Sequence, residues 1–158
     1  MQITFITIGT LKESYLRDAI AEYEKRISAF ATVKNVNLPE TRVVDEENPQ
    51  KVLEALEQEG DKILSAIPDG AYVVALCIEG KQYSSEELAR ILGDARDRCG
   101  KIAFIIGSSH GLAPKVKNAA HLRLSFSKMT FPHQLARILL AESTYRSLTI
   151  LAGKRYHK

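Results

Sequence analysis

The sequence alternates short apolar runs with amphipathic segments along its whole length, and this alternation limits the folds that it can adopt. The apolar runs, rich in β-branched residues, predict strands near residues 1–9, 33–38, 71–78, 101–106 and 122–126. Segments with apolar residues at helical spacing predict helices near residues 11–27, 49–67, 84–95, 115–120 and 132–148. Strands and helices in this order predict an α/β fold, with a mostly parallel sheet and helices on both faces. Because no repeat or linker interrupts the pattern, we expect residues 1–158 to form a single domain.

Several helix starts carry recognisable capping residues. Thr10 and Glu13 have the spacing of a capping box at the start of the first helix, and Ser84 and Glu87 have it at the third. Asn48 followed by proline predicts the start of the second helix. Pro132 opens the last helix, for which we expect one apolar face formed by Leu135, Ile138, Leu139, Tyr145 and Leu148.

Composition excludes several classes of protein. Apolar residues make up 45% of the chain and charged residues 26%, as in an ordinary globular protein. No apolar run approaches the ~20 residues of a membrane span, and the N-terminus lacks the basic and small-residue features of a secretory signal. The two cysteines, Cys77 and Cys99, are too few for a disulfide framework or a zinc cluster. We therefore expect a cytoplasmic protein with no metal and no membrane association.

Charge is distributed unevenly along the chain. Residues 1–100 hold 12 Lys and Arg against 18 Asp and Glu, whereas residues 101–158 hold 10 Lys and Arg and a single acid, Glu142. All four histidines also fall in the second stretch. A basic third of this kind is typical of a partner that carries phosphates, although the charges can also scatter over different faces once the chain folds.

Three loops of the C-terminal half are candidates for a binding site. They cover residues 76–80, 107–112 and 126–133, and each follows one of the last three predicted strands. In parallel α/β sheets, ligands bind where the carboxyl ends of strands and the loops after them gather. The sequence therefore predicts a ligand site at this edge of the sheet.

Two familiar kinds of site fit these loops poorly. The first strand is followed by one glycine and a lysine, which does not match the Gly-rich dinucleotide fingerprint, and no Walker A motif is present. Residues 107–111 match the G-x-S-x-G pattern of a serine hydrolase, with Ser109 as the nucleophile. The only acid and histidine that follow in the required order are Glu142, within the predicted last helix, and His157. A hydrolase is thus a weak alternative.

A longer and more specific signal lies in residues 125–146 and in the ending KRYHK. The run SFSKMTFPHQL, followed by Glu142, Tyr145 and Arg146, resembles the RlmH family of bacterial ribosomal RNA methyltransferases, which belong to the SPOUT superfamily. The resemblance covers essentially the whole chain. It implies an α/β fold with a C-terminal trefoil knot, S-adenosylmethionine as methyl donor, and a homodimer. It further implies methylation at N3 of a pseudouridine in 23S ribosomal RNA on assembled ribosomes.

The resemblance also implies which residues bind the donor. By position these are Leu76, Gly107, Phe126, Ser127, Lys128, Met129, Thr130 and Phe131. One departure is Ser108, which stands where the family usually has a second glycine. A position that needs a positive φ would be strained by serine.

For the transfer step, the N3 of a uracil-type ring carries a proton, so a general base or stabilisation of the anion would help. The basic tail suggests His157 and Tyr156 for a role at the substrate, with the tyrosine able to stack on a base. Residues that could contact RNA phosphates are Arg137, Arg146, Lys154, Arg155 and Lys158. A different reading of the same basic surface is a non-catalytic protein that binds RNA or the ribosome.

Overall fold

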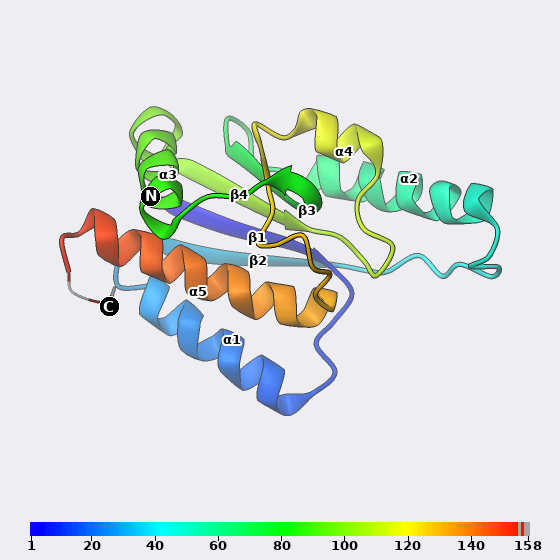
Figure 1. Ribbon diagram of the computed structural model, residues 1–158, viewed down its shortest axis with the longest axis horizontal. Coiled ribbons are helices and arrows are strands. Elements are labelled where there is room, and N and C mark those ends of the chain that lie inside the picture. Colours follow the sequence, from blue (N-terminus) through cyan, green and yellow to red (C-terminus); the bar gives the residue numbers. More distant parts are fainter. Residues whose placement is uncertain (155, 157–158) are drawn as a thin grey trace.

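The computed structural model describes residues 1–154 and 156, and its elements follow the alternating order predicted from the sequence. The strands are β1 (Gln2–Ile8), β2 (Thr32–Leu38), β3 (Tyr72–Lys81), β4 (Lys101–Ile106) and β5 (Leu122–Leu124). The helices are α1 (Ser14–Ile27), α2 (Pro49–Ala66), α3 (Ser85–Cys99), α4 (Pro114–Ala119) and α5 (His133–Leu151) (Figure 1).

The five strands form one sheet in the order β2-β1-β4-β3-β5, and every pair of neighbours is parallel. Their carboxyl ends therefore lie at the same edge of the sheet. The three candidate loops follow β3, β4 and β5, and β3 lies between β4 and β5 in the sheet. This arrangement brings the loops together.

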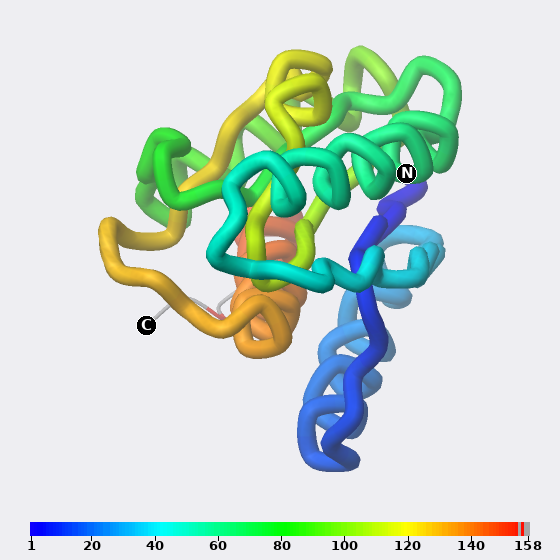
Figure 2. The backbone as a smooth tube through the Cα atoms, turned by 90° about the vertical axis from the view of Figure 1, so that its right-hand side faces the viewer, coloured from blue at the N-terminus to red at the C-terminus, as the bar shows by residue number. Residues whose placement is uncertain are grey.

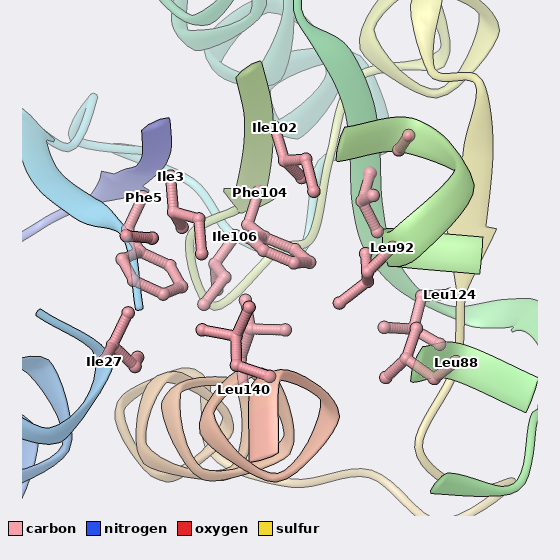
Figure 3. Packing of buried hydrophobic residues seen from close by; sticks show 14 residues of the cluster. Ile3, Phe5, Ile27, Leu88, Leu92, Ile102, Phe104, Ile106, Leu124 and Leu140 are labelled. Atoms are coloured by element: carbon pink, nitrogen blue, oxygen red, sulfur yellow. The ribbon is translucent and has the colours of Figure 1, made fainter. Parts of the chain in front are cut away.

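Both faces of the inner strands β1 and β4 are buried, as expected for parallel strands flanked by helices, whereas the edge strand β2 has no buried residue. In β1, Ile3 and Phe5 join one hydrophobic cluster, and Ile6 and Ile8 join the other. The first cluster includes residues of α1, α3 and α5, and its centre is Phe104, whose ring stacks on Phe5 (Figure 3). The second cluster includes residues of α2 and α4, which lie together on the opposite side of the sheet (Figure 1). The predicted α/β sheet with helices on both faces is confirmed.

Three of the four predicted helix starts are confirmed, and one of them is Pro132, which directly precedes α5. The Asn48 side chain accepts a hydrogen bond from the backbone N–H of Gln50, and Ser84 and Glu87 form a reciprocal capping box. The predicted capping box at the first helix is wrong. That helix begins at Ser14 after Glu13, which makes no side-chain cap.

The predicted apolar face of the last helix is confirmed only in part, since Tyr145 and Leu148 pack in or against the core. Leu148 is buried, but Leu135 and Leu139 are 43% and 38% exposed, and the buried face uses smaller residues such as Ala136 and Ala141. Apolar residues occur nearly all round α5, so their spacing does not reveal which side packs on α1 and α3. As a result, α5 presents apolar side chains to solvent.

The trefoil knot and the single domain over residues 1–158 stay predictions. Within the described residues, no helix is long and apolar enough to cross a membrane.

Candidate ligand cavity and its surroundings

The three candidate loops enclose one cavity of about 490 Å³ at the carboxyl ends of β3, β4 and β5. We call it the main cavity. It is lined by residues 76–79, 106–112, 117, 125–127, 129–133 and 136. Its size falls within the range of roughly 300–1,000 Å³ typical of small-molecule sites.

The first wall of the main cavity is an irregularity in β3. Both Leu76 and Lys81 pair with Leu124 of β5, so residues 77–80 loop out of the ladder between them. Gly80 returns the chain to β5 so closely that a Cβ there would lie 2.7 Å from the carbonyl carbon of Leu124. The residues that loop out include Ile78, which is 51% exposed in the cavity wall.

The second wall is a tight turn after β4. The backbone N–H of Gly111 donates to the carbonyl oxygen of Ser108 at 3.0 Å, and Gly111 has a φ of +91°. A Cβ on Gly107 would lie 1.9 Å from the carbonyl oxygen of Gly111. Glycine at position 107 is therefore required for the turn to close on itself.

Ser108 causes no backbone strain. Among the residues that the structure describes, positive φ values occur only at glycines. The Ser108 side chain points inward, is 5% exposed, and donates a hydrogen bond to the buried carboxyl group of Glu59 at 3.0 Å.

The third wall is the segment from β5 to α5, which Figure 2 shows running across to the start of the last helix. Ser125 Oγ donates to the carbonyl oxygen of Ser127, and Ser127 Oγ accepts from the backbone N–H of Met129. These bonds order a loop that exposes two apolar side chains, Met129 and Phe131, to 70% and 38%. Lys128 is exposed and does not line the main cavity.

The polar side chains that line the main cavity include one charged pair. Glu79 pairs with Lys117 of α4, and this hydrogen bond holds the pKa of the Glu79 carboxyl below its ordinary value. Burial raises the pKa of the Cys77 thiol, so this cysteine is not an activated nucleophile. The rest of the lining combines apolar side chains and loop backbone with the polar side chains of Ser109, His110, Ser125, Ser127, Thr130 and His133, which suits a ligand with a flat apolar part and polar edges.

The hydrolase alternative loses its triad. Ser109 is exposed in the turn and lines the main cavity, but Glu142 is paired with Arg146 one turn away on α5 at 2.5 Å. The acid that the triad would need is therefore committed to a neighbouring guanidinium.

The expected catalytic tail residue Tyr156 does not line the main cavity of its own chain. Its ring contacts Tyr145 edge-on at 4.7 Å, and the Arg146 guanidinium lies 4.9 Å from its centroid. The main cavity touches α5 only near its start, at His133 and Ala136. At 1.5 Å per residue, Tyr145 lies about 15 Å further along the helix. His157, Arg155 and Lys158 lie outside the described residues.

The structure corrects the assignment of Arg137 to an RNA-binding surface. Arg137 is only 9% exposed, and its guanidinium donates to the side-chain oxygen of Asn37 at 2.8 Å and to the carbonyl oxygen of Gly9 at 3.3 Å. Burial lowers the pKa of this guanidinium from its ordinary value. The spacing of the arginines along the helix could not show that this one faces the sheet. Two more of the predicted RNA-binding cations lie among the described residues. Arg146 forms an ion pair with Glu142, and Lys154 lies over the Phe30 ring.

A second cavity, of about 440 Å³, lies at the carboxyl ends of β1 and β2. It shares His133 with the main cavity and is otherwise lined by Gly9, Thr10, Lys12, Asn37, Leu38, Pro39, Glu40 and Gln134. The sequence did not predict this cavity, and in the main cavity it did not single out Ile78 or His110. Their membership in the three loops was the available signal. The described residues contain no group of three or more His, Cys, Asp or Glu placed to hold a metal ion.

The fold and the main cavity together define an α/β protein with a cavity of small-molecule size at the carboxyl ends of its parallel strands. A family model described as a predicted SPOUT methyltransferase matches residues 1–157. The chain belongs to the SPOUT methyltransferase family.

Full-length relatives agree with this assignment, and solved structures share the fold. The chain is 43% identical to the Ribosomal RNA large subunit methyltransferase H of Streptococcus gordonii and 48% identical to that of Bacillus thuringiensis, with both chains covered completely in each case. Its fold is similar to a probable methyltransferase from Bordetella pertussis, with a TM-score of 0.59 and 17% identity over 92% of this chain and 93% of that one. It is also similar to a probable methylase family protein from Haemophilus influenzae, with a TM-score of 0.56 and 16% identity over 99% of this chain and 70% of that one.

Proposed function

We propose that this protein transfers a methyl group from S-adenosylmethionine to ribosomal RNA of the large subunit, at N3 of a pseudouridine in 23S RNA. The observation that carries the proposal is the main cavity, formed by three loops at the carboxyl ends of β3, β4 and β5. Full-length relatives that carry the name of a large-subunit ribosomal RNA methyltransferase support the choice of substrate.

The residues of the main cavity fit a nucleoside-type donor. Its volume of about 490 Å³ suits a ligand of that size. Ile78, Met129 and Phe131 present exposed apolar surface to it, which an adenine ring would cover. The turn after β4 brings backbone close to the cavity, because Gly107 carries no side chain there.

S-adenosylmethionine, when bound, supplies a methyl group that its sulfonium has already activated. The chain's own residues then have three tasks: to bind, to orient and to exclude water. Leu76 and the loops at 107–112 and 126–131 bind and orient the donor. Lys128, which does not line the cavity, has no side-chain part in this site.

The second cavity is the proposed place of the target nucleotide. It adjoins the main cavity at His133, so a base held there would face the methyl donor. Lys12 and Gln134 in its wall can donate hydrogen bonds to the carbonyl oxygens of a uracil-type ring or to a phosphate.

If the C-terminal residues take part in methyl transfer, the active site requires a second copy of the chain. Tyr156 lies at the end of α5 that is remote from the main cavity, so it can act on the substrate only from a partner subunit, and we propose His157 for the same role. The exposed Leu135 and Leu139, one turn apart on α5, support a homodimer. Lys154, Arg155 and Lys158 are the proposed cations for RNA phosphates, and Arg146 could join them only by leaving its ion pair with Glu142. An enzyme that acts on assembled ribosomes works in the cytoplasm.

Methyl transfer to ribosomal particles tests the proposal. Ribosomes that lack the modification are incubated with methyl-labelled S-adenosylmethionine, with separated large subunits and free ribosomal RNA as parallel substrates. Label mapped to one pseudouridine of 23S RNA in whole ribosomes supports the proposal. RNA binding without donor binding would instead favour the non-catalytic RNA-binding alternative, to which the basic stretch of residues 101–158 points.

A further inference from the structure

We infer that Glu59 is a positioning residue of the donor site, whose buried carboxyl group holds the turn after β4 against the segment after β2. The inference rests on the proposed function, because it treats the main cavity as the place of the methyl donor. Glu59 itself does not line that cavity.

The contacts of Glu59 are directed at two loops. Its side chain belongs to α2 and the residue is only 2% exposed. One carboxyl oxygen, Oε1, accepts the backbone N–H of Thr41 at 2.7 Å, and the other, Oε2, accepts the hydroxyl of Ser108 at 3.0 Å. These partners lie 18 and 49 residues away in sequence. One side chain thus joins three separate parts of the chain.

A carboxyl group in this position is costly to bury. Desolvation of such a group is unfavourable unless hydrogen bonds replace its water. The neighbouring acids Glu57 and Asp61 pair with Lys115 at the surface, but no ion pair of the described residues includes Glu59. An apolar residue would satisfy the packing of α2 at lower cost, so the benefit of a carboxyl group here is the geometry that it imposes on its two partners.

Both partners border a proposed binding site. Ser108 lines the main cavity directly after Gly107. Thr41 follows Pro39 and Glu40, which line the second cavity. Figures 1 and 2 show the segment of residues 39–48, in cyan, passing beside the turn after β4, in yellow-green. Glu59 therefore fixes the turn after β4, which lines the main cavity, relative to the segment after β2, which lines the second cavity.

The test compares donor binding by variants of the full-length protein, measured by calorimetric titration with S-adenosylmethionine. In Glu59→Ala, both hydrogen bonds are lost and the turn after β4 loosens, so we expect the Kd to rise about tenfold. Glu59→Gln keeps the volume, accepts the Thr41 N–H through its oxygen and donates to Ser108 through its nitrogen. We expect this variant to bind the donor within about threefold of the wild type.

A double-mutant cycle separates positioning from general stability. If Glu59 acts on the donor through the Ser108 hydroxyl, Ser108→Ala adds no further loss of affinity in the Glu59→Ala background. In transfer assays, the donor KM should rise more than kcat falls. Glu54→Ala is the matched control, since Glu54 is an exposed α2 glutamate whose ion pair among the described residues is with Lys51, and the donor Kd of this variant should not change.

The outcomes are distinct. Wild-type affinity in a folded Glu59→Ala protein, or additive losses in the cycle, would overturn the inference. Should Glu59→Ala not fold, Ser108→Ala decides alone, and an unchanged Kd in that variant overturns the inference as well. Absence of donor binding by the wild type would instead refute the proposed function.

Discussion

Replacement of Gly107 by alanine tests the role of the turn after β4 most sharply. A Cβ at this position would lie 1.9 Å from the carbonyl oxygen and 2.5 Å from the carbonyl carbon of Gly111, whereas real Cβ atoms essentially never approach within 3.0 Å. The backbone of Gly111 would have to move by about 1 Å to accept the new methyl group. Gly107→Ala therefore displaces a wall of the main cavity.

The size of the effect follows from this displacement. Overpacking of a tight site costs about 1–3 kcal/mol of stability, and a misplacement of about 1 Å near reacting groups can cost on the order of 10² in rate. We expect the donor Kd to rise at least about tenfold, which corresponds to ~1.4 kcal/mol. Calorimetric titration gives the Kd, and thermal denaturation gives the Tm.

Gly70→Ala is the matched control. Gly70 has a φ of +70°, and a Cβ at this position would meet no other atom within 4 Å. It lies just before β3, at the opposite edge of the sheet from the main cavity. Alanine there costs about 1–2 kcal/mol of backbone strain but should leave the donor Kd unchanged. If Gly107→Ala had the donor affinity and Tm of the wild type, the reasoning would be refuted, because the turn would then accommodate a side chain at position 107.

Three further predictions concern other parts of the molecule. Ser109→Ala should retain methyl transfer, and the wild type should not react with a serine-directed fluorophosphonate; labelling of Ser109 would revive the hydrolase. Arg137→Ala should lower the free energy of unfolding by about 1.5–3 kcal/mol, because it removes buried hydrogen bonds from a charged donor. The RNA affinity of Arg137→Ala should fall with salt concentration as steeply as that of the wild type. A weaker salt dependence together with normal stability would show that Arg137 contacts RNA. Leu135→Glu combined with Leu139→Glu should shift the protein to a monomer in sedimentation equilibrium, whereas an unchanged dimer would place the interface elsewhere.

The sequence predicts the fold well because the fold depends on local patterns. Alternating strands and helices imply a parallel sheet, and a parallel sheet gathers its loops at one edge. The order of the elements is therefore enough to place the three loops of the main cavity together. The capping of α3 by Ser84 also follows from local spacing alone, and it is confirmed.

The failed capping box of Thr10 and Glu13 is local, but the failures at the candidate site involve contacts between distant parts of the chain. Arg137 is buried because Gly9 and Asn37, 128 and 100 residues away in sequence, offer it acceptors. The role of Glu59 depends in the same way on Ser108, its partner from another loop. Neither pairing leaves a periodic trace in the sequence. The exposed side of α5 was equally hard to predict, since a helix that is apolar nearly all round has no distinctive face.

Backbone amide shifts during titration with S-adenosylmethionine test the central claim most directly, because they report where the donor binds. We predict that the shifts concentrate in residues 76–79, 107–112 and 125–133, most of which line the main cavity. Saturable shifts confined to the second cavity, or no shifts at all, would contradict this prediction.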